Sequence, residues 1–99
     1  MTDVTTEKIS KIIRSYLINS NDYYVDVSLS GISDNIYIIV VSRFFDDMKE
    51  KQKHDYIWNI IENSNLSREE RLRISMVTVM NPDDIISEFN SKAWKKENY

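Results

Sequence analysis

Cysteine is absent from this sequence of 99 residues, which contains one glycine, one proline and one histidine. Without cysteine the chain can form no disulfide, has no thiol nucleophile and offers no thiolate to zinc or to an iron–sulfur cluster. The absence fits a reducing compartment, and residues 1–11 are too polar for a signal peptide, so we expect a cytoplasmic protein. A single glycine also excludes a glycine-rich phosphate loop.

Long apolar runs and an excess of positive charge are lacking as well. The longest apolar run covers residues 36–41, far fewer than the roughly 20 residues of a membrane helix, so no membrane partner is expected. The net charge of −3 argues against strong, non-specific binding to nucleic acid. Hydrophobic residues make up 41% of the chain, which is enough for one modest core, and we expect a single domain over residues 1–99.

The first half of the chain predicts a helix followed by a hairpin of two strands. One helical face is formed by Ile9, Ile12, Ile13, Tyr16 and Leu17. Residues 23–29 alternate between apolar and polar, which places Tyr23 and Tyr24 on opposite faces, with one of them exposed. Residues 36–41 are apolar on both faces, which predicts a central strand covered on each side. The short link with Gly31 makes the pair antiparallel.

The second half predicts a helix, a short helical turn, a strand and a last helix. Asp46-Asp47 is expected to open the helix, which runs to about Glu62. A capping box at residues 67–70 predicts the turn, and Asn81-Pro82 starts the last helix. The second helix is expected to turn Ile57, Ile60 and Ile61 inward, and the last helix has an apolar face of Ile85, Ile86, Phe89 and Ala93. On the third strand, one face is expected to hold Leu72, Ile74, Met76, Thr78 and Met80. The fold class is α/β (α+β), in the order α-β-β-α-(turn)-β-α with a three-stranded mixed sheet.

A local motif accompanies this order. A strand ends in Val41-Ser42, an aromatic residue follows at Phe45, and the next helix has a basic residue and a histidine at Lys53-His54, then an aromatic residue at Trp58. Ser75–Met80 then leads into Asn81-Pro82-Asp83-Asp84. Over roughly residues 23–89 this pattern resembles the BolA-like family, whose fold is related to the type II KH domain. The residues in register with the family motif are Phe45, His54, Ile57, Trp58 and Ile61.

The resemblance implies a non-enzymatic adaptor that partners a monothiol glutaredoxin in iron–sulfur cluster handling. The two proteins would share a two-iron/two-sulfur cluster with His54 as the metal ligand from this chain, and neutral imidazole is a known ligand of such centres. Lys53 and Trp58 are expected to shape the surroundings of His54 and to contact the partner. Because the flanking Lys53 and Asp55 are charged, we expect this stretch of the helix to reach water, with the His54 ring free of a buried partner.

Two alternatives remain open. One is a nucleic-acid-binding transcriptional regulator that uses the KH-like fold, although a KH domain needs a Gly-x-x-Gly clamp that the single Gly31 cannot supply. The other is an interaction module that has lost both activities, because Asp47 stands where the family usually has Gly and Asp55 where it usually has Arg. The basic residues are interpreted as solvated helix faces, and the acidic pairs as helix caps, with no catalytic residues. These basic residues are Lys49, Lys51, Lys53, Lys92, Lys95 and Lys96, and the acidic pairs are Asp46-Asp47 and Asp83-Asp84.

Overall fold

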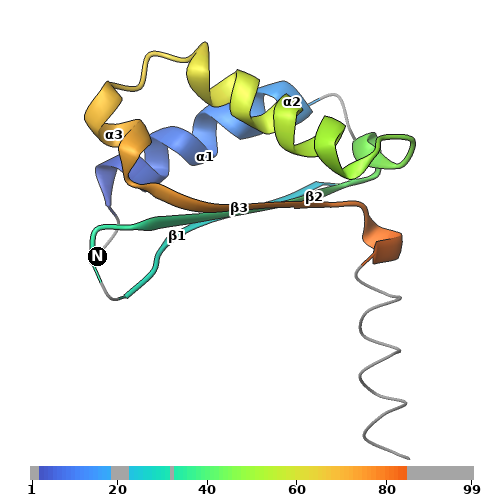
Figure 1. Ribbon diagram of the computed structural model, residues 1–99, viewed down its shortest axis with the longest axis horizontal. Coiled ribbons are helices and arrows are strands. Elements are labelled where there is room, and N and C mark those ends of the chain that lie inside the picture. Colours follow the sequence, from blue (N-terminus) through green and yellow to red (C-terminus); the bar gives the residue numbers. More distant parts are fainter. Residues whose placement is uncertain (1–2, 19–22, 32, 85–99) are drawn as a thin grey trace, which may run out of the picture.

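The computed structural model describes residues 3–18, 23–31 and 33–84. Figure 1 shows a layer of helices above a twisted sheet. The elements are α1 (Val4–Leu17), β1 (Tyr23–Leu29), β2 (Ile36–Ser42), the 3-10 turn η1 (Arg43–Phe45), α2 (Glu50–Glu62), α3 (Arg68–Leu72) and β3 (Ile74–Met80). This is the predicted α+β order as far as residues 82–84, which are helical. The rest of the expected last helix, with Ile85, Ile86, Phe89 and Ala93, lies outside the described residues.

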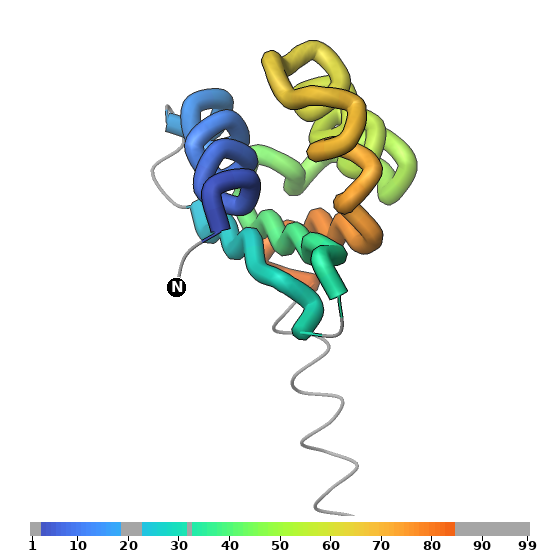
Figure 2. The backbone as a smooth tube through the Cα atoms, turned by 90° about the vertical axis from the view of Figure 1, so that its left-hand side faces the viewer, coloured from blue at the N-terminus to red at the C-terminus, as the bar shows by residue number. Residues whose placement is uncertain are grey.

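The sheet is mixed and has the strand order β1-β2-β3. β1 pairs with β2 antiparallel, and β2 pairs with β3 parallel. The parallel pairing requires a crossover, which α2 and α3 supply. The predicted central position of β2 is therefore confirmed. We also expected both faces of β2 to be covered by other elements. Among the described elements only one face is covered, because α1, α2 and α3 all lie on the same side of the sheet (Figures 1 and 2).

The core lies between that helical layer and the sheet. α1 buries every third or fourth residue, and α2 buries its predicted inward positions. Tyr16 is an exception to the predicted face of α1, because 54% of its side chain is exposed. It lines a shallow groove between α1 and α2 with Tyr56 and Ile60, a position that lets a phenol hydroxyl reach water. The residues of α1, β2, η1 and α2 without exposed surface are Ile9, Ile13, Ile36, Ile38, Val40, Phe45, Ile57 and Ile61.

The face predicted for the third strand is wrong beyond Ile74. In the parallel pairing Ile36 lies opposite Ile74 and Tyr37 lies opposite Met76, so Ser75 is an extra residue in β3. Such an irregularity shifts the alternation by one position, which moves every later side chain to the other face. The buried positions after it are therefore Val77 and Val79, while Met76 is exposed. Leu72 does not belong to the strand at all but ends α3.

The predicted start of the second helix is also wrong, because η1 occupies the place expected for its first turn. The Ser42 side chain accepts a hydrogen bond from the Phe44 N–H at 3.1 Å, and the turn places Phe45 fully inside the core. Asp46 is the residue that ends this turn. α2 begins only at Glu50. Burial of one aromatic ring therefore takes precedence over the preference of acidic residues for a helix N-terminus.

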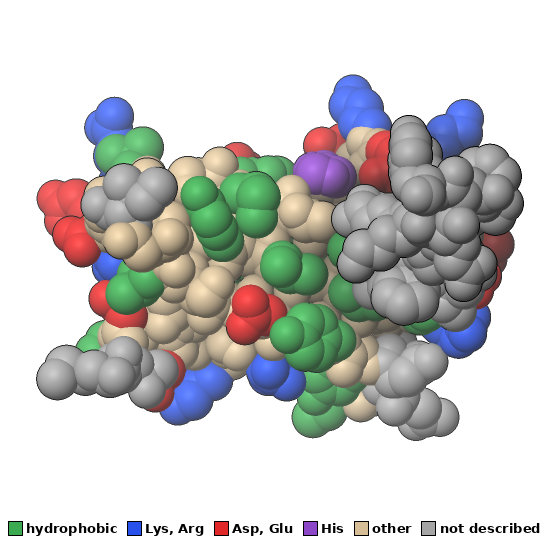
Figure 3. All heavy atoms as spheres, turned by 90° about the horizontal axis from the view of Figure 1, so that it is seen from below, with side chains coloured by type: hydrophobic (Ala, Val, Ile, Leu, Met, Phe, Trp, Pro, Cys, Tyr) green, Lys and Arg blue, Asp and Glu red, His purple; other side chains and the backbone are tan. Residues whose placement is uncertain are grey.

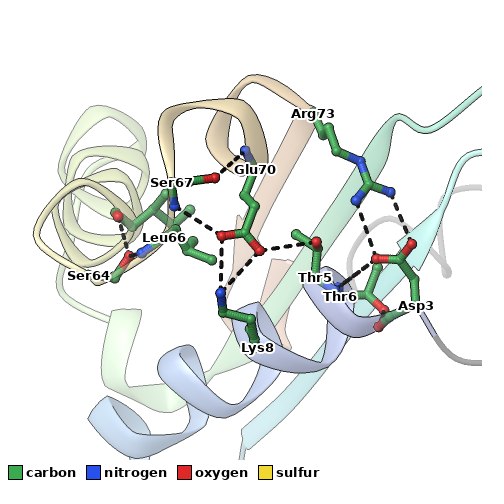
Figure 4. Close-up of polar contacts among 10 residues, drawn as sticks. Asp3, Thr5, Thr6, Lys8, Ser64, Leu66, Ser67, Glu70 and Arg73 are labelled. Atoms are coloured by element: carbon green, nitrogen blue, oxygen red, sulfur yellow. Dashed lines mark hydrogen bonds and ion pairs between the residues drawn. The ribbon is translucent and has the colours of Figure 1, made fainter.

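Polar contacts join α1 to α3, and they join Asp3, the N-cap of α1, to Arg73, the residue before β3 (Figure 4). Glu70 accepts hydrogen bonds from the Ser67 N–H at 3.0 Å, from Lys8 Nζ at 3.0 Å and from Thr5 Oγ1 at 3.2 Å. The Ser67 and Lys8 bonds hold the pKa of the Glu70 carboxyl at about 2, below its ordinary 4.5. This confirms the predicted capping box of residues 67–70, and it shows a second use of the same carboxylate, as the link to α1.

Within the part of the chain that the structure describes, no helix is long and apolar enough to cross a membrane.

Candidate functional site

His54 lies in the second turn of α2, and its side chain is half-buried. The single histidine, purple in Figure 3, is visible at the molecular surface. Its ring makes no hydrogen bond to any residue that the structure describes. In general, a neutral imidazole without a hydrogen-bond partner has a ring nitrogen lone pair that can bind a metal ion.

Lys53 does not reach water as the sequence predicts, because only 3% of its side chain is exposed. Its Nζ lies 2.9 Å from Glu50 Oε1 and 3.1 Å from Asp84 Oδ2. The hydrogen bond with Glu50, and also the one with Asp84, raise the pKa of Lys53 above its ordinary value, although burial acts in the opposite direction. Asp84 is 31 residues away in the sequence, so periodicity within the helix could not reveal this partner. Lys53 therefore holds the first turns of α2 to the segment that follows β3.

Trp58 follows His54 by four residues, so the two side chains lie on the same face of α2. Trp58 is half-buried and lines a groove of about 620 Å³ between α2, α3 and the start of β3. Leu72, on the α3 side of this groove, has 71% of its side chain exposed. The groove offers apolar surface with cations at its margin. The remaining lining residues are Glu62, Asn63, Arg68, Arg71 and Ile74.

The sequence indicated Trp58 as a surface aromatic residue but missed its neighbours in the groove. Leu72 was assigned to the face of a strand, and Arg68 was noted only as part of a capping box. The one available signal was that capping box, because it places a helical turn immediately before β3. A turn in that position directs the last residue of α3 away from the sheet.

The described residues contain no group of three or more histidine, aspartate and glutamate side chains that could hold a metal ion. His54 can therefore supply one ligand, but not a complete metal site, from this part of the chain. Asp55, the next residue, is exposed, and neighbours in sequence point to different faces of a helix.

Two of the acidic residues that were interpreted as helix caps have side-chain partners. The Asp84 carboxylate accepts a hydrogen bond from Lys53 Nζ, and the Asp84 backbone N–H donates one to Asn81 Oδ1 at 2.9 Å. Asp46 forms an ion pair with Arg43 at 3.7 Å. Of the basic residues of α2 and its N-cap, Lys49 and Lys51 are exposed and Lys53 is buried. Lys92, Lys95 and Lys96 lie outside the described residues.

The comparisons with known proteins give a likeness of fold. No protein-family model matches the sequence, and no curated protein matches it. Among solved structures, BolA1 from Arabidopsis thaliana superposes on 83% of this chain and 96% of its own, with a TM-score of 0.53 and 9% sequence identity. At this identity the match bears on the fold alone. Together with the mixed sheet and the order of the elements, it shows that the chain has a BolA-like fold.

Proposed function

We propose that this protein is a non-enzymatic adaptor that partners a monothiol glutaredoxin in iron–sulfur cluster handling. The observation that carries the proposal is the placement of His54, half-buried on α2 with a ring that makes no hydrogen bond to any described residue. It stands at the position where the sequence is in register with the BolA-like motif, and the fold that surrounds it is BolA-like.

In this proposal the chain contributes one metal ligand to the cluster. Neutral imidazole can replace thiolate at one iron of a two-iron/two-sulfur cluster. His54 would give that nitrogen, and the partner would give the thiolates, since this chain has no cysteine. No acid–base or nucleophilic group of this chain is required, which is why the proposal assigns it no enzymatic activity.

The three residues singled out by the sequence take different parts in this proposal. His54 binds the cluster. Trp58 and the adjacent Leu72 contact the partner through the groove between α2 and α3, where an exposed aliphatic side chain gains most from burial. Lys53 is buried and acts as a positioning residue, because its ion pair with Asp84 holds the turn of α2 that carries His54.

The experiment is co-expression with a monothiol glutaredoxin, followed by co-purification and absorption spectroscopy. The parent protein is expected to give a coloured complex of the two chains. His54→Ala should change the spectrum or shorten the lifetime of the cluster, and His54→Cys should restore a stable cluster with a shifted spectrum, because it returns a ligand as thiolate. Lys51→Ala, an exposed neighbour on the same helix, serves as control. If the His54→Ala complex has the same spectrum and cluster lifetime as the parent complex, His54 is not the ligand.

The groove has its own matched pair of variants. Leu72 and Val4 are each 71% exposed, but only Leu72 lines the groove. Leu72→Asp should weaken binding of the glutaredoxin about tenfold, equivalent to about 1.4 kcal/mol, whereas Val4→Asp should leave the dissociation constant unchanged. Isothermal titration calorimetry measures both. An equal effect of the two substitutions would place the contact elsewhere on the molecule.

A further inference from the structure

β1 forms one edge of the sheet, since the order of the described strands is β1-β2-β3. In an antiparallel pair, successive residues of a strand turn their backbone groups alternately toward the neighbouring strand and away from it. The Ser30 N–H donates to the Asn35 carbonyl across the hairpin at 2.9 Å, so the even-numbered residues of β1 face β2. The backbone N–H and C=O groups of Val25 and Val27 therefore point outward, along the edge of the sheet.

α1 lies beside this edge and leaves a hollow next to it. Figure 2 shows α1 above the β1 side of the sheet, whereas α2 packs above β3. The hollow has a volume of about 200 Å³. An edge strand beside a hollow is a surface to which an extended peptide can add as a further strand. The hollow is lined by Thr6, Glu7, Ser10 and Arg14 of α1 and by Val25, Asp26 and Val27 of β1.

Arg14 occupies part of the exposed edge. Its Nη2 donates to the Val25 carbonyl at 2.8 Å, and its Nε donates to Ser10 Oγ at 2.9 Å. The backbone N–H and C=O of Val27, by contrast, have no hydrogen-bond partner within the part of the chain that the structure describes. An added strand can therefore form a complete hydrogen-bonded pair with Val27 but not with Val25.

The side chains around the hollow favour a cation. Glu7 is exposed and Asp26 is half-buried, and neither carboxylate forms an ion pair or a side-chain hydrogen bond among the described residues. Val27 packs against the core, so its side chain points to the helical layer. Residues directly opposite each other in an antiparallel pair share a face. The side chain opposite Val27 would thus lie over the hollow, on the face where α1 carries Glu7.

We propose that the edge of β1 binds an extended basic segment of a partner protein, which adds to the sheet as an antiparallel strand. A lysine or arginine of the segment lies opposite Val27, with its cation over the hollow near Glu7. An adjacent basic residue lies on the other face of the sheet, beside Asp26. The net charge of −3 favours the encounter with a basic partner. This inference is independent of the proposed function, because His54 and Trp58 lie on α2.

The test measures binding of a short fluorescein-labelled peptide to the full chain by fluorescence anisotropy. The peptide consists of valine and threonine with two adjacent lysines at its centre, and a second peptide has glutamates in their place. Saturable binding of the lysine peptide alone is expected. Glu7→Gln should weaken it about fivefold, the usual effect of losing a partly exposed ion pair. Glu69→Gln, an exposed position in the first turn of α3, should leave it unchanged.

A second measurement changes the peptide alone, so it does not depend on how a variant folds. Alternate residues of the lysine peptide are N-methylated, which in one series removes the amide hydrogens that face β1 and in the other removes those that face away. One series should bind about tenfold more weakly, because hydrogen bonds to the strand are lost, and the other should bind like the parent peptide. Equal binding of the two series overturns the addition of a strand, and so does the absence of saturable binding.

Two further outcomes would also reject the proposal. Equal affinity for the lysine and glutamate peptides would show that charge does not select the segment. Sedimentation velocity that finds dimers of the chain alone, dissociated by Val27→Pro, would make the edge of a second copy the occupant, since proline removes the outward N–H.

Discussion

Replacement of Lys53 by methionine should change the free energy of unfolding by less than about 1 kcal/mol. The side chain is 3% exposed, and both of its acidic partners lie partly in water, Glu50 at 76% and Asp84 at 42% exposure. The attraction to such partners is weak because water screens it. The loss of the two ion pairs is offset by the removal of the cost of burying an ammonium group. Methionine also retains most of the buried stem.

Two related variants separate the stem from the charge. Lys53→Ala removes about three buried methylene groups, each contributing about 0.8 kcal/mol, so it should cost about 2–3 kcal/mol. Asp84→Ala leaves the ammonium buried with Glu50 alone and should cost about 1–2 kcal/mol. Lys51→Ala, at an exposed position of the same helix, should stay within about 0.5 kcal/mol.

Urea unfolding followed by circular dichroism measures all four variants. The expected order of destabilisation places Lys53→Ala first, Asp84→Ala second, and Lys53→Met with the control. If Lys53→Met costs as much as Lys53→Ala, the charge rather than the stem stabilises this part of the fold, and the reasoning is refuted. If Asp84→Ala matches the parent protein, the ion pair does not hold the segment after β3 to α2.

Three further predictions test the fold around the site. The pKa of Glu70 is lowered from 4.5 to about 2, so its contribution to stability is complete above about pH 5 and is lost as the pH falls towards 2; Glu70→Gln should flatten this part of a curve of unfolding free energy against pH. Asn81→Ala should lower the unfolding free energy by about 1 kcal/mol, the usual loss of a helix cap, and a melting temperature equal to that of the parent would reject the cap. Phe45→Ala should cost about 3–5 kcal/mol in urea unfolding, because the ring is fully buried against Phe44 and Tyr56.

The order of the elements could be predicted from periodicity because each signal is local. Ile57, Ile60 and Ile61 repeat within one helix, and residues 36–41 are apolar enough to require a central strand. The errors arise where a contact distant in sequence overrides a local preference. One extra residue at Ser75 reversed the face of β3, and burial of Phe45 displaced the start of α2 from Asp46-Asp47 to Glu50.

The candidate site was only partly predictable for the same reason. His54 and Trp58 are four residues apart, so their common face follows from helix geometry. Lys53 lies on the same stretch of helix, but its partner Asp84 follows β3 in the sequence. No pattern within α2 shows that Lys53 is buried. Leu72 was missed because the alternating pattern of the strand was extended to it, whereas the residue ends α3.

The assignment of His54 as the cluster ligand has one direct test, because this chain contains a single histidine. The chain is labelled with ¹⁵N-histidine, combined with unlabelled glutaredoxin, and the cluster of the purified complex is reduced for pulsed electron paramagnetic resonance. We predict a ¹⁵N hyperfine coupling of a directly bound imidazole, absent from the His54→Ala complex. A cluster that forms in the complex without any ¹⁵N coupling would contradict the proposal that His54 binds it.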